Sequence, residues 1–312
     1  MDITAASPMS PASAAPVGAF VDGTIDGAGQ FTDLRLLDRT GPTALYSARE
    51  AATGRPVALK LIDPSAPAFI REAVDREAEY LTVLGTHPHV ITLYRRIVMC
   101  DGRDALVLQA CPGSAAAAAR GHRFSVPEAV AVAIKVAGAI ETVHHAGLVH
   151  CAVRPQNVLL TEFDEPVLSD FAVAGPIGEP FVVGIDETTA HTAPELLLGE
   201  GPTPATDVYG LASTLYELIS GRAAFRAYDG EPPASVSLRI LAGGVRPIVA
   251  PAVPLELSDL LVWGMAADPK ERPPSAAWLA EELGRLEQGN GWPRTKMVTG
   301  EAHVDDRRKR RR

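Results

Sequence analysis

The chain of 312 residues has few cysteines, few aromatic residues and no long apolar segment. Its three cysteines, Cys100, Cys111 and Cys151, are too few and too widely spaced for a disulfide framework or a zinc site, and they favour a reducing compartment. The best candidate for a transmembrane segment, 129–140, contains Lys135 and is shorter than the roughly 20 residues that cross a bilayer. The first residues also lack the regions of a signal peptide, so we expect a cytoplasmic protein without a transmembrane segment.

Positive charge is scarce outside the carboxy terminus. The formal net charge is −9, and since six of the 29 basic residues occupy 307–312, the preceding 306 residues carry −15. Such an acidic body does not favour a groove for polyphosphate, so we expect no specific nucleic-acid partner. The basic run at 307–312 suits an anionic membrane or an acidic partner better than sequence-specific nucleic acid.

What the chain does contain is two regions of different pattern between two tails. Residues 1–28 are rich in Ala, Ser and Pro and are expected to be disordered. Residues 29–111 predict five strands, within 34–48, 56–61, 91–99 and 105–110, and one helix over 69–84. Residues 112–288 predict helices over 115–119, 126–146, 207–220, 255–265 and 276–287 and two short strands near 158–160 and 167–168, and 289–312 is expected to be a polar tail with a basic end. This order predicts an α+β fold of two lobes with a cleft between them.

Seven short motifs occur along these regions in one order. They are VALK at 57–60, REA at 76–78, HCAVRPQNVLL at 150–160, LSDFA at 168–172, APE at 193–195, DVYG at 207–210 and DPKERP at 268–273. Each is weak alone, but together they resemble the protein kinase family, in particular the bacterial serine/threonine kinases of the eukaryotic type, over roughly residues 31–288. The resemblance implies a kinase-like N-lobe, rich in strands with one long helix, and a larger helical C-lobe.

The resemblance also implies a site for ATP and magnesium. Lys60 matches the lysine that contacts the α- and β-phosphates, and Glu77 matches its helix partner. Asn157 and Asp170 match the two magnesium ligands, an amide and a carboxylate oxygen donor. Leu45, Ala58 and Leu159 match the apolar residues on either side of the adenine ring. Leu108 matches the residue that flanks the pocket, and Gln109 to Cys111 match the hinge.

Three further matches concern the scaffold of such a fold. Glu195 and Arg272 match a buried ion pair that anchors the end of the activation segment. Asp207 matches the carboxylate that holds the backbone of the catalytic loop.

The chain departs from the family where the chemistry takes place. Ala152 stands where the family has the aspartate that orients the substrate hydroxyl and accepts its proton, and a methyl group does neither, so no catalytic residue is expected. Cys151 replaces the arginine that binds an activation-segment phosphate, and Arg154 replaces a lysine.

The glycine-rich loop is also altered. Asp38, Thr40 and Thr43 occupy its three glycine positions, where glycine allows a close approach of the backbone to phosphate. Asp38 adds repulsion toward a polyphosphate, so ATP is expected to bind weakly or not at all. Ala172 replaces the glycine that follows Asp170 and Phe171.

These departures leave three hypotheses. The first is a pseudokinase, a kinase fold that serves as a signalling scaffold; the second is an active serine/threonine kinase with rearranged catalytic residues; the third is a nucleotide-sensing regulator. Protein partners are expected in each case, such as an active kinase and a phosphopeptide-binding module. The hydroxyl groups considered for phosphorylation are Thr4, Ser7, Ser10, Ser13, Thr24, Thr188 and Thr189.

Overall fold

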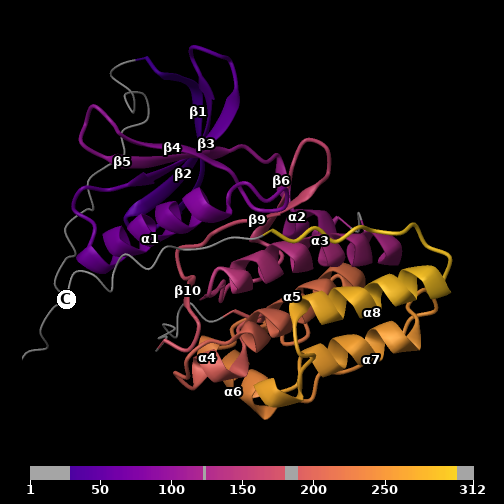
Figure 1. Cartoon of the computed structure of the whole chain (residues 1–312). Helices are drawn as coiled ribbons and strands as arrows, with labels where there is room; N and C mark the ends of the chain where they lie inside the picture. Colours follow the sequence, from indigo (N-terminus) through magenta and orange to yellow (C-terminus); the bar gives the residue numbers. More distant parts are fainter. Residues whose placement is uncertain (1–28, 122–123, 180–188, 301–312) are drawn as a thin grey trace, which may run out of the picture.

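A computed structural model describes residues 29–121, 124–179 and 189–300 (Figure 1). The considered phosphorylation sites in 1–28, Thr188 and the basic run at 307–312 lie outside the described residues. Within the described part, no helix is both long and apolar enough to cross a bilayer.

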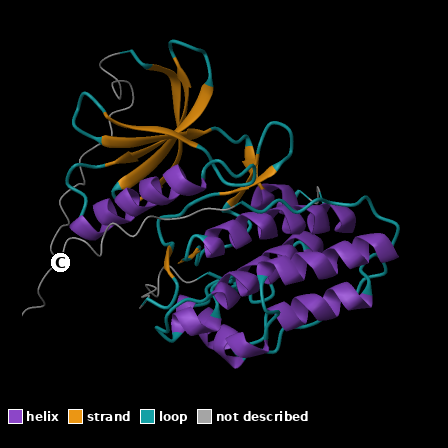
Figure 2. Cartoon of the chain, in the orientation of Figure 1, coloured by secondary structure: helices purple, strands orange, loops and turns teal. Residues whose placement is uncertain are grey.

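The N-lobe is a five-stranded antiparallel sheet with one helix against it (Figures 1 and 2). The strand order is β1-β2-β3-β5-β4, and every neighbouring pair is antiparallel. The elements are β1 (Phe31–Thr40), β2 (Thr43–Glu50), β3 (Pro56–Ile62), α1 (Ala68–Leu84), β4 (Leu93–Val98) and β5 (Asp104–Gln109). The five expected strands and the long helix are therefore confirmed, with ends that shift by a few residues.

Alternation along β3 divides the two faces of the sheet. Val57, Leu59 and Leu61 are fully buried in a cluster on one face, whereas Ala58 and Lys60 point to the opposite face, because successive side chains of a strand alternate. The second face meets α1, which buries Val74, Ala78 and Leu81 at helical spacing against the main core. Lys60 thus lies on the face of the sheet that α1 covers, and Glu77 lies on the buried face of α1.

The C-lobe is mainly helical. Its longer elements are α2 (Ala115–Arg120), α3 (Val126–His145), α5 (Pro204–Ser220), α6 (Pro233–Ala242), α7 (Leu255–Gly264) and α8 (Ala276–Gly289). Its short elements are β6 (Gly113–Ser114), β7 (Leu148–Val149), β8 (Val158–Leu160), β9 (Pro166–Leu168), β10 (Gly175–Pro176), α4 (Pro194–Leu197) and the 3-10 turn η2 (Pro269–Glu271).

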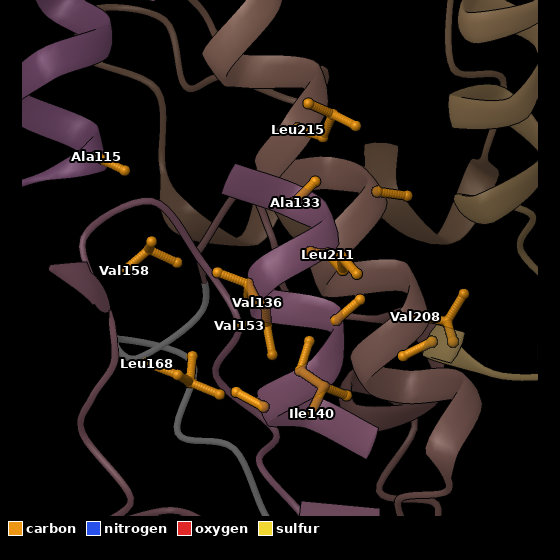
Figure 3. Close-up of a cluster of buried hydrophobic side chains, with 14 of the residues drawn as sticks. Ala115, Ala133, Val136, Ile140, Val153, Val158, Leu168, Val208, Leu211 and Leu215 are labelled. Atoms are coloured by element: carbon orange, nitrogen blue, oxygen red, sulfur yellow. The ribbon is translucent and has the colours of Figure 1, made fainter. Parts of the chain in front are cut away.

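Helix α3 is the centre of this lobe. A capping box between Ser125 and Glu128 starts it. Val136 and Ile140 then pack against Leu211 of α5 and against the segment that leads to β8 and β9 (Figure 3). The small side chains of α3 allow close packing of its neighbours, so the loops that carry the polar motifs rest on a rigid base.

Two helices were not expected from the sequence, and one helix begins earlier than expected. Helices α4 and α6 are short, and both begin with a proline at the first turn, which obscures their apolar spacing. Helix α5 begins at Pro204 rather than at Asp207, because Thr203 and Thr206 form a capping box one turn earlier.

The segment 292–300, called here the strap, corrects the expectation of a polar tail from residue 289. It has no regular secondary structure, as expected, but Trp292 and Met297 pack against the main core. Its backbone is held at Gly300, whose N–H donates to Thr142 Oγ1 at 2.9 Å, and at Val298, whose carbonyl oxygen lies 2.8 Å from His87 Nε2. Figure 1 shows the strap crossing α3 from the end of α8.

Candidate functional site

The site begins with an ion network between the lobes. Lys60 Nζ lies 2.6 Å from Glu77 Oε2 and 3.4 Å from Asp170 Oδ1. Burial acts to lower the pKa of Lys60, but the two carboxylates outweigh it and hold this pKa above its ordinary value. Three residues that are far apart in the sequence thus form one charged cluster, and the lysine remains an ammonium at neutral pH.

Asp170 is fixed in this cluster by an unusual backbone. Its φ of 65° lies in the left-handed region, which is strained for a residue with a Cβ. The next residue, Phe171, is fully buried and packs edge-on against the ring of His150 at 4.6 Å between centroids. Burial acts to raise the pKa of Asp170, but Lys60 outweighs it with help from Arg154, so this pKa lies below its ordinary value and the carboxylate is ionised at neutral pH.

The expected adenine-pocket residues share one face of the sheet. Leu45 pairs with Lys60 and Ala58 pairs with Leu108, so these side chains lie on the face that carries Lys60. From the other lobe, Leu159 of β8 is partly buried against the same core as Ala58 and Leu108. The structure therefore places Leu45, Ala58 and Leu108 on one face of the sheet, and Leu159 packs against the same core from β8; their role in an adenine pocket stays a prediction.

The segment expected to be the hinge leaves β5 at Gln109. The N–H of Gln109 donates to Thr92 O at 2.9 Å, which fixes the end of the strand. Cys111 follows and packs against the main core, and its burial raises the pKa of the thiol to about 11. Cys111 is therefore a neutral thiol at physiological pH.

The β1–β2 hairpin, where the family has its glycine-rich loop, is closed and offers few donors. Thr40 pairs directly with Thr43, and the Thr43 hydroxyl donates to Thr40 O at 2.8 Å. Only Gly41 and Pro42 form the turn, with Gly41 at a φ of 54°. Proline has no backbone N–H. The tip therefore lacks one of the donors that such a loop would turn toward a phosphate.

The catalytic-loop backbone is held as the resemblance implied. The carboxylate of Asp207 accepts the N–H of His150 at 2.8 Å and the N–H of Cys151 at 2.9 Å, and it also lies 2.9 Å from His144 Nε2. These bonds keep Cys151 at a φ of 64°. The Asp207 side chain is 1% exposed, so it serves the loop and not a ligand.

Ala152 sits in an otherwise well-ordered loop. Its N–H donates to His150 Nδ1 at 3.2 Å, and its carbonyl oxygen accepts from Asn157 Nδ2 at 2.9 Å. His150 is fully buried, and burial keeps the pKa of its ring below the ordinary value, so the ring is neutral with its hydrogen on Nε2, 3.1 Å from Ser169 O. Hydrogen bonds thus fix the backbone at residue 152, but the side chain at that position is only a methyl group.

Arg154 lies within this loop, between Ala152 and Asn157. Its Nε is buried and has no hydrogen-bond partner among the described residues. Its charge helps to lower the pKa of Asp170. A guanidinium with unused donors in this position suits an anion, such as a terminal phosphate.

Asn157 and Asp170 supply the donor set that the family uses for magnesium. Asn157 donates its Nδ2 to Ala152 O, which leaves its Oδ1 as a possible ligand, and Asp170 is ionised. Amide and carboxylate oxygens suit this hard cation. The residues present therefore fit a magnesium ion, although Asp170 already contacts Lys60.

The ion pair expected at the end of the activation segment is present. Arg272 donates from Nη1 and Nη2 to the two carboxylate oxygens of Glu195, at 2.8 and 2.7 Å, and both side chains are at most 3% exposed. Arg272 also bonds the carbonyl oxygens of Ala205 and Ala266.

Sequence reasoning missed two members of these networks. Thr206 donates its hydroxyl to Glu195 Oε1 at 2.8 Å, and His144 contacts Asp207. Thr206 had a local signal, because it stands three residues after Thr203 at the start of a helix. His144 lies in the last turn of α3, and nothing in its sequence neighbourhood points to a residue 63 positions away.

Comparison with known proteins places this geometry in context. The protein kinase domain family matches residues 39–283. The chain is 32% identical over 265 residues to serine/threonine-protein kinase PknK of Mycobacterium tuberculosis, and this match covers 84% of this chain and 24% of PknK. It is 33% identical over 264 residues to PknD of the same species, covering 81% of this chain and 39% of PknD. It is 36% identical over 234 residues to PkaB of Streptomyces coelicolor, covering 70% of this chain and 54% of PkaB. The chain thus spans about a quarter of PknK and about half of PkaB.

Proposed function

Because the chain belongs to the protein kinase family, we propose that it is a pseudokinase, which responds to nucleotide and partner proteins without transferring phosphate. The observation that carries the proposal is Ala152. The loop around it keeps its backbone bonds to Asn157 and its anchor on Asp207, but the side chain cannot orient a hydroxyl or accept its proton.

Within the part of the chain that the structure describes, the three buried or ion-paired carboxylates around the loop are each engaged and do not substitute for the missing one. Asp170 is engaged by Lys60 at 3.4 Å, and its lowered pKa makes it a weak base. Asp207 is buried beneath the loop and bonded to two backbone N–H groups. Glu195 is committed to Arg272. For one of these three to serve a rearranged active kinase, the alternative, it would have to leave its partner.

The retained cluster of Lys60, Glu77 and Asp170 supports nucleotide sensing over an inert scaffold. Burying the Lys60 ammonium between two carboxylates costs free energy of desolvation. A fold has a reason to keep such a costly cluster where its ammonium binds a phosphate. When bound, ATP with magnesium would supply a polyphosphate that bridges the lobes. Lys60 would then contact the phosphates, Arg154 would face their terminal end, and Asn157 and Asp170 would hold the ion.

The test is a titration of the purified full chain with Mg-ATP, in which thermal unfolding and the fate of the γ-phosphate are followed in the same samples. We expect the unfolding temperature to rise with ATP, the rise to be smaller in Lys60→Met, and the γ-phosphate to remain on the nucleotide. Phosphate transfer would overturn the proposal. An unchanged unfolding temperature at millimolar ATP would leave only the scaffold.

A further inference from the structure

A groove between α7 and α8 lies outside the site described above. It has a volume of about 330 Å³. Helix α7 contributes Glu256, Asp259 and Trp263, which share one face at helical spacing, and α8 contributes Trp278, Glu282 and Leu286 in the same way. Figure 1 places these two helices away from the N-lobe.

The lining combines two indole rings with three carboxylates. Trp263 and Trp278 meet edge-to-face at 4.9 Å between centroids, and Trp263 is 40% exposed although its N–H donates to Glu271 O. Glu256 and Asp259 are exposed and form no ion pair with any other described residue, while Glu282 bonds Arg285. The exposed indole of Trp263 beside two carboxylates without an ion pair favours a planar cation, because a guanidinium stacks on the ring and bonds the carboxylate.

We propose that this groove binds the chain's own basic run, residues 307–312. These six residues are all Arg or Lys, and the rest of the chain carries −15. The charge of the groove is therefore complementary to the one strongly basic segment of the sequence. The inference is independent of the nucleotide site.

The end of the strap lies within reach of the groove. Gly300 N–H bonds Thr142, and the neighbouring Glu141 accepts the N–H of Ala277 at 3.1 Å, one residue before Trp278. Residues 301–306 separate Gly300 from the basic run. Six residues span up to about 20 Å when extended, so Arg307 can reach the α8 end of the groove within the same chain.

Tryptophan fluorescence tests the proposal in the full chain, because two of its three tryptophans line the groove. Acrylamide quenching is compared between the wild type and a variant carrying Arg307→Gln, Arg308→Gln, Lys309→Gln, Arg310→Gln, Arg311→Gln and Arg312→Gln. We expect stronger quenching in the variant, and we expect about 0.5 M salt to raise quenching in the wild type only, because salt screens the contact. Equal quenching would overturn the proposal. A dependence on protein concentration would also overturn it, since the occupant would then be a second copy.

A peptide of residues 307–312, titrated against the same glutamine variant, locates the contact. In that background, Asp259→Lys should weaken binding about tenfold, because it replaces an attraction by a repulsion. The matched control is Glu281→Lys, which makes the same change of charge on the exposed side of α8 outside the groove. It should weaken binding less than about twofold. Equal losses in the two variants would mean a diffuse charge effect and would contradict the groove.

Discussion

Arg272 closes the C-lobe by donating from two nitrogens to both carboxylate oxygens of Glu195, in a pair that is almost completely buried. The two residues are 77 positions apart, and the guanidinium also lies 4.9 Å from the centre of the Tyr209 ring. One side chain thus ties the short helix α4 to the start of α5 and to the turn before α8.

Removing that guanidinium should destabilise the C-lobe. Arg272→Ala leaves the Glu195 carboxylate buried and unpaired, which typically costs about 3–5 kcal/mol. Denaturant unfolding of the full chain measures this cost. Arg285→Ala, which removes an exposed ion pair, is the control and should cost less than about 1 kcal/mol. An unchanged stability of Arg272→Ala would mean that the pair does not support the lobe.

Two helical glycines should respond in opposite ways to alanine. A Cβ at Gly138 would overlap the carbonyl oxygen of Val298 in the strap, whereas a Cβ at Gly284 meets no atom within 4 Å. Gly284→Ala should therefore stabilise by about 0.5–1 kcal/mol, the usual gain inside a helix. Gly138→Ala should displace the strap.

Trypsin reports the position of the strap, because Arg294 and Lys296 lie exposed within it. We expect Gly138→Ala to speed cleavage after these residues and Gly284→Ala to leave the rate unchanged. Equal cleavage rates in the two variants would show that the strap does not depend on the space above Gly138.

The three cysteines should differ in their reaction with iodoacetamide. Cys100 is exposed, whereas burial raises the pKa of Cys111 to about 11 and also raises the pKa of Cys151. Because only the thiolate reacts, Cys111 at pH 8 should carry about a hundredfold less thiolate than an ordinary cysteine, and its rate should keep rising as the pH approaches 11. Mass spectrometry of the labelled peptides measures each rate. Labelling of Cys111 as fast as Cys100 would contradict the burial of this segment.

Nucleotide affinity should come mainly from adenine. The apolar residues between the lobes are retained, but Pro42 lacks an N–H and Asp38 adds negative charge to the hairpin. We expect ATP to bind at most about tenfold more tightly than adenosine, or about 1.4 kcal/mol, in a calorimetric titration with magnesium. If ATP bound thousands of times more tightly and Asp170→Asn removed that gain, the hairpin would be a working phosphate cradle.

Much of this molecule could be predicted from the sequence, because motifs at fixed spacing report a fold. The alternation around Lys60 and the long apolar helix α3 have signals in the chain itself, whereas the pairing of Glu195 with Arg272 was implied only by the resemblance of their motifs to the family. The strap had none. Trp292 and Met297 show no periodicity, and the strap meets α3 across more than 150 residues, where Gly300 bonds Thr142, so only tertiary packing reveals that residues 292–300 belong to the lobe. Similarly, the positive φ of Cys151 accompanies a backbone bond to Asp207, 56 residues away, and has no local signal in the sequence.

The measurement that tests the central claim most directly is transfer of labelled γ-phosphate from Mg-ATP. The purified full chain, Lys60→Met and Ala152→Asp are incubated alone and with a generic basic protein substrate. Loss of the aspartate removes a contribution to proton transfer of about 10²–10⁴-fold, and the hairpin is impaired as well. We therefore predict that label on the wild type equals label on Lys60→Met, and that Ala152→Asp gains little unless Asp38, Thr40 and Thr43 are also changed to glycine. Labelling of serine or threonine by the wild type that disappears in Lys60→Met would contradict the account.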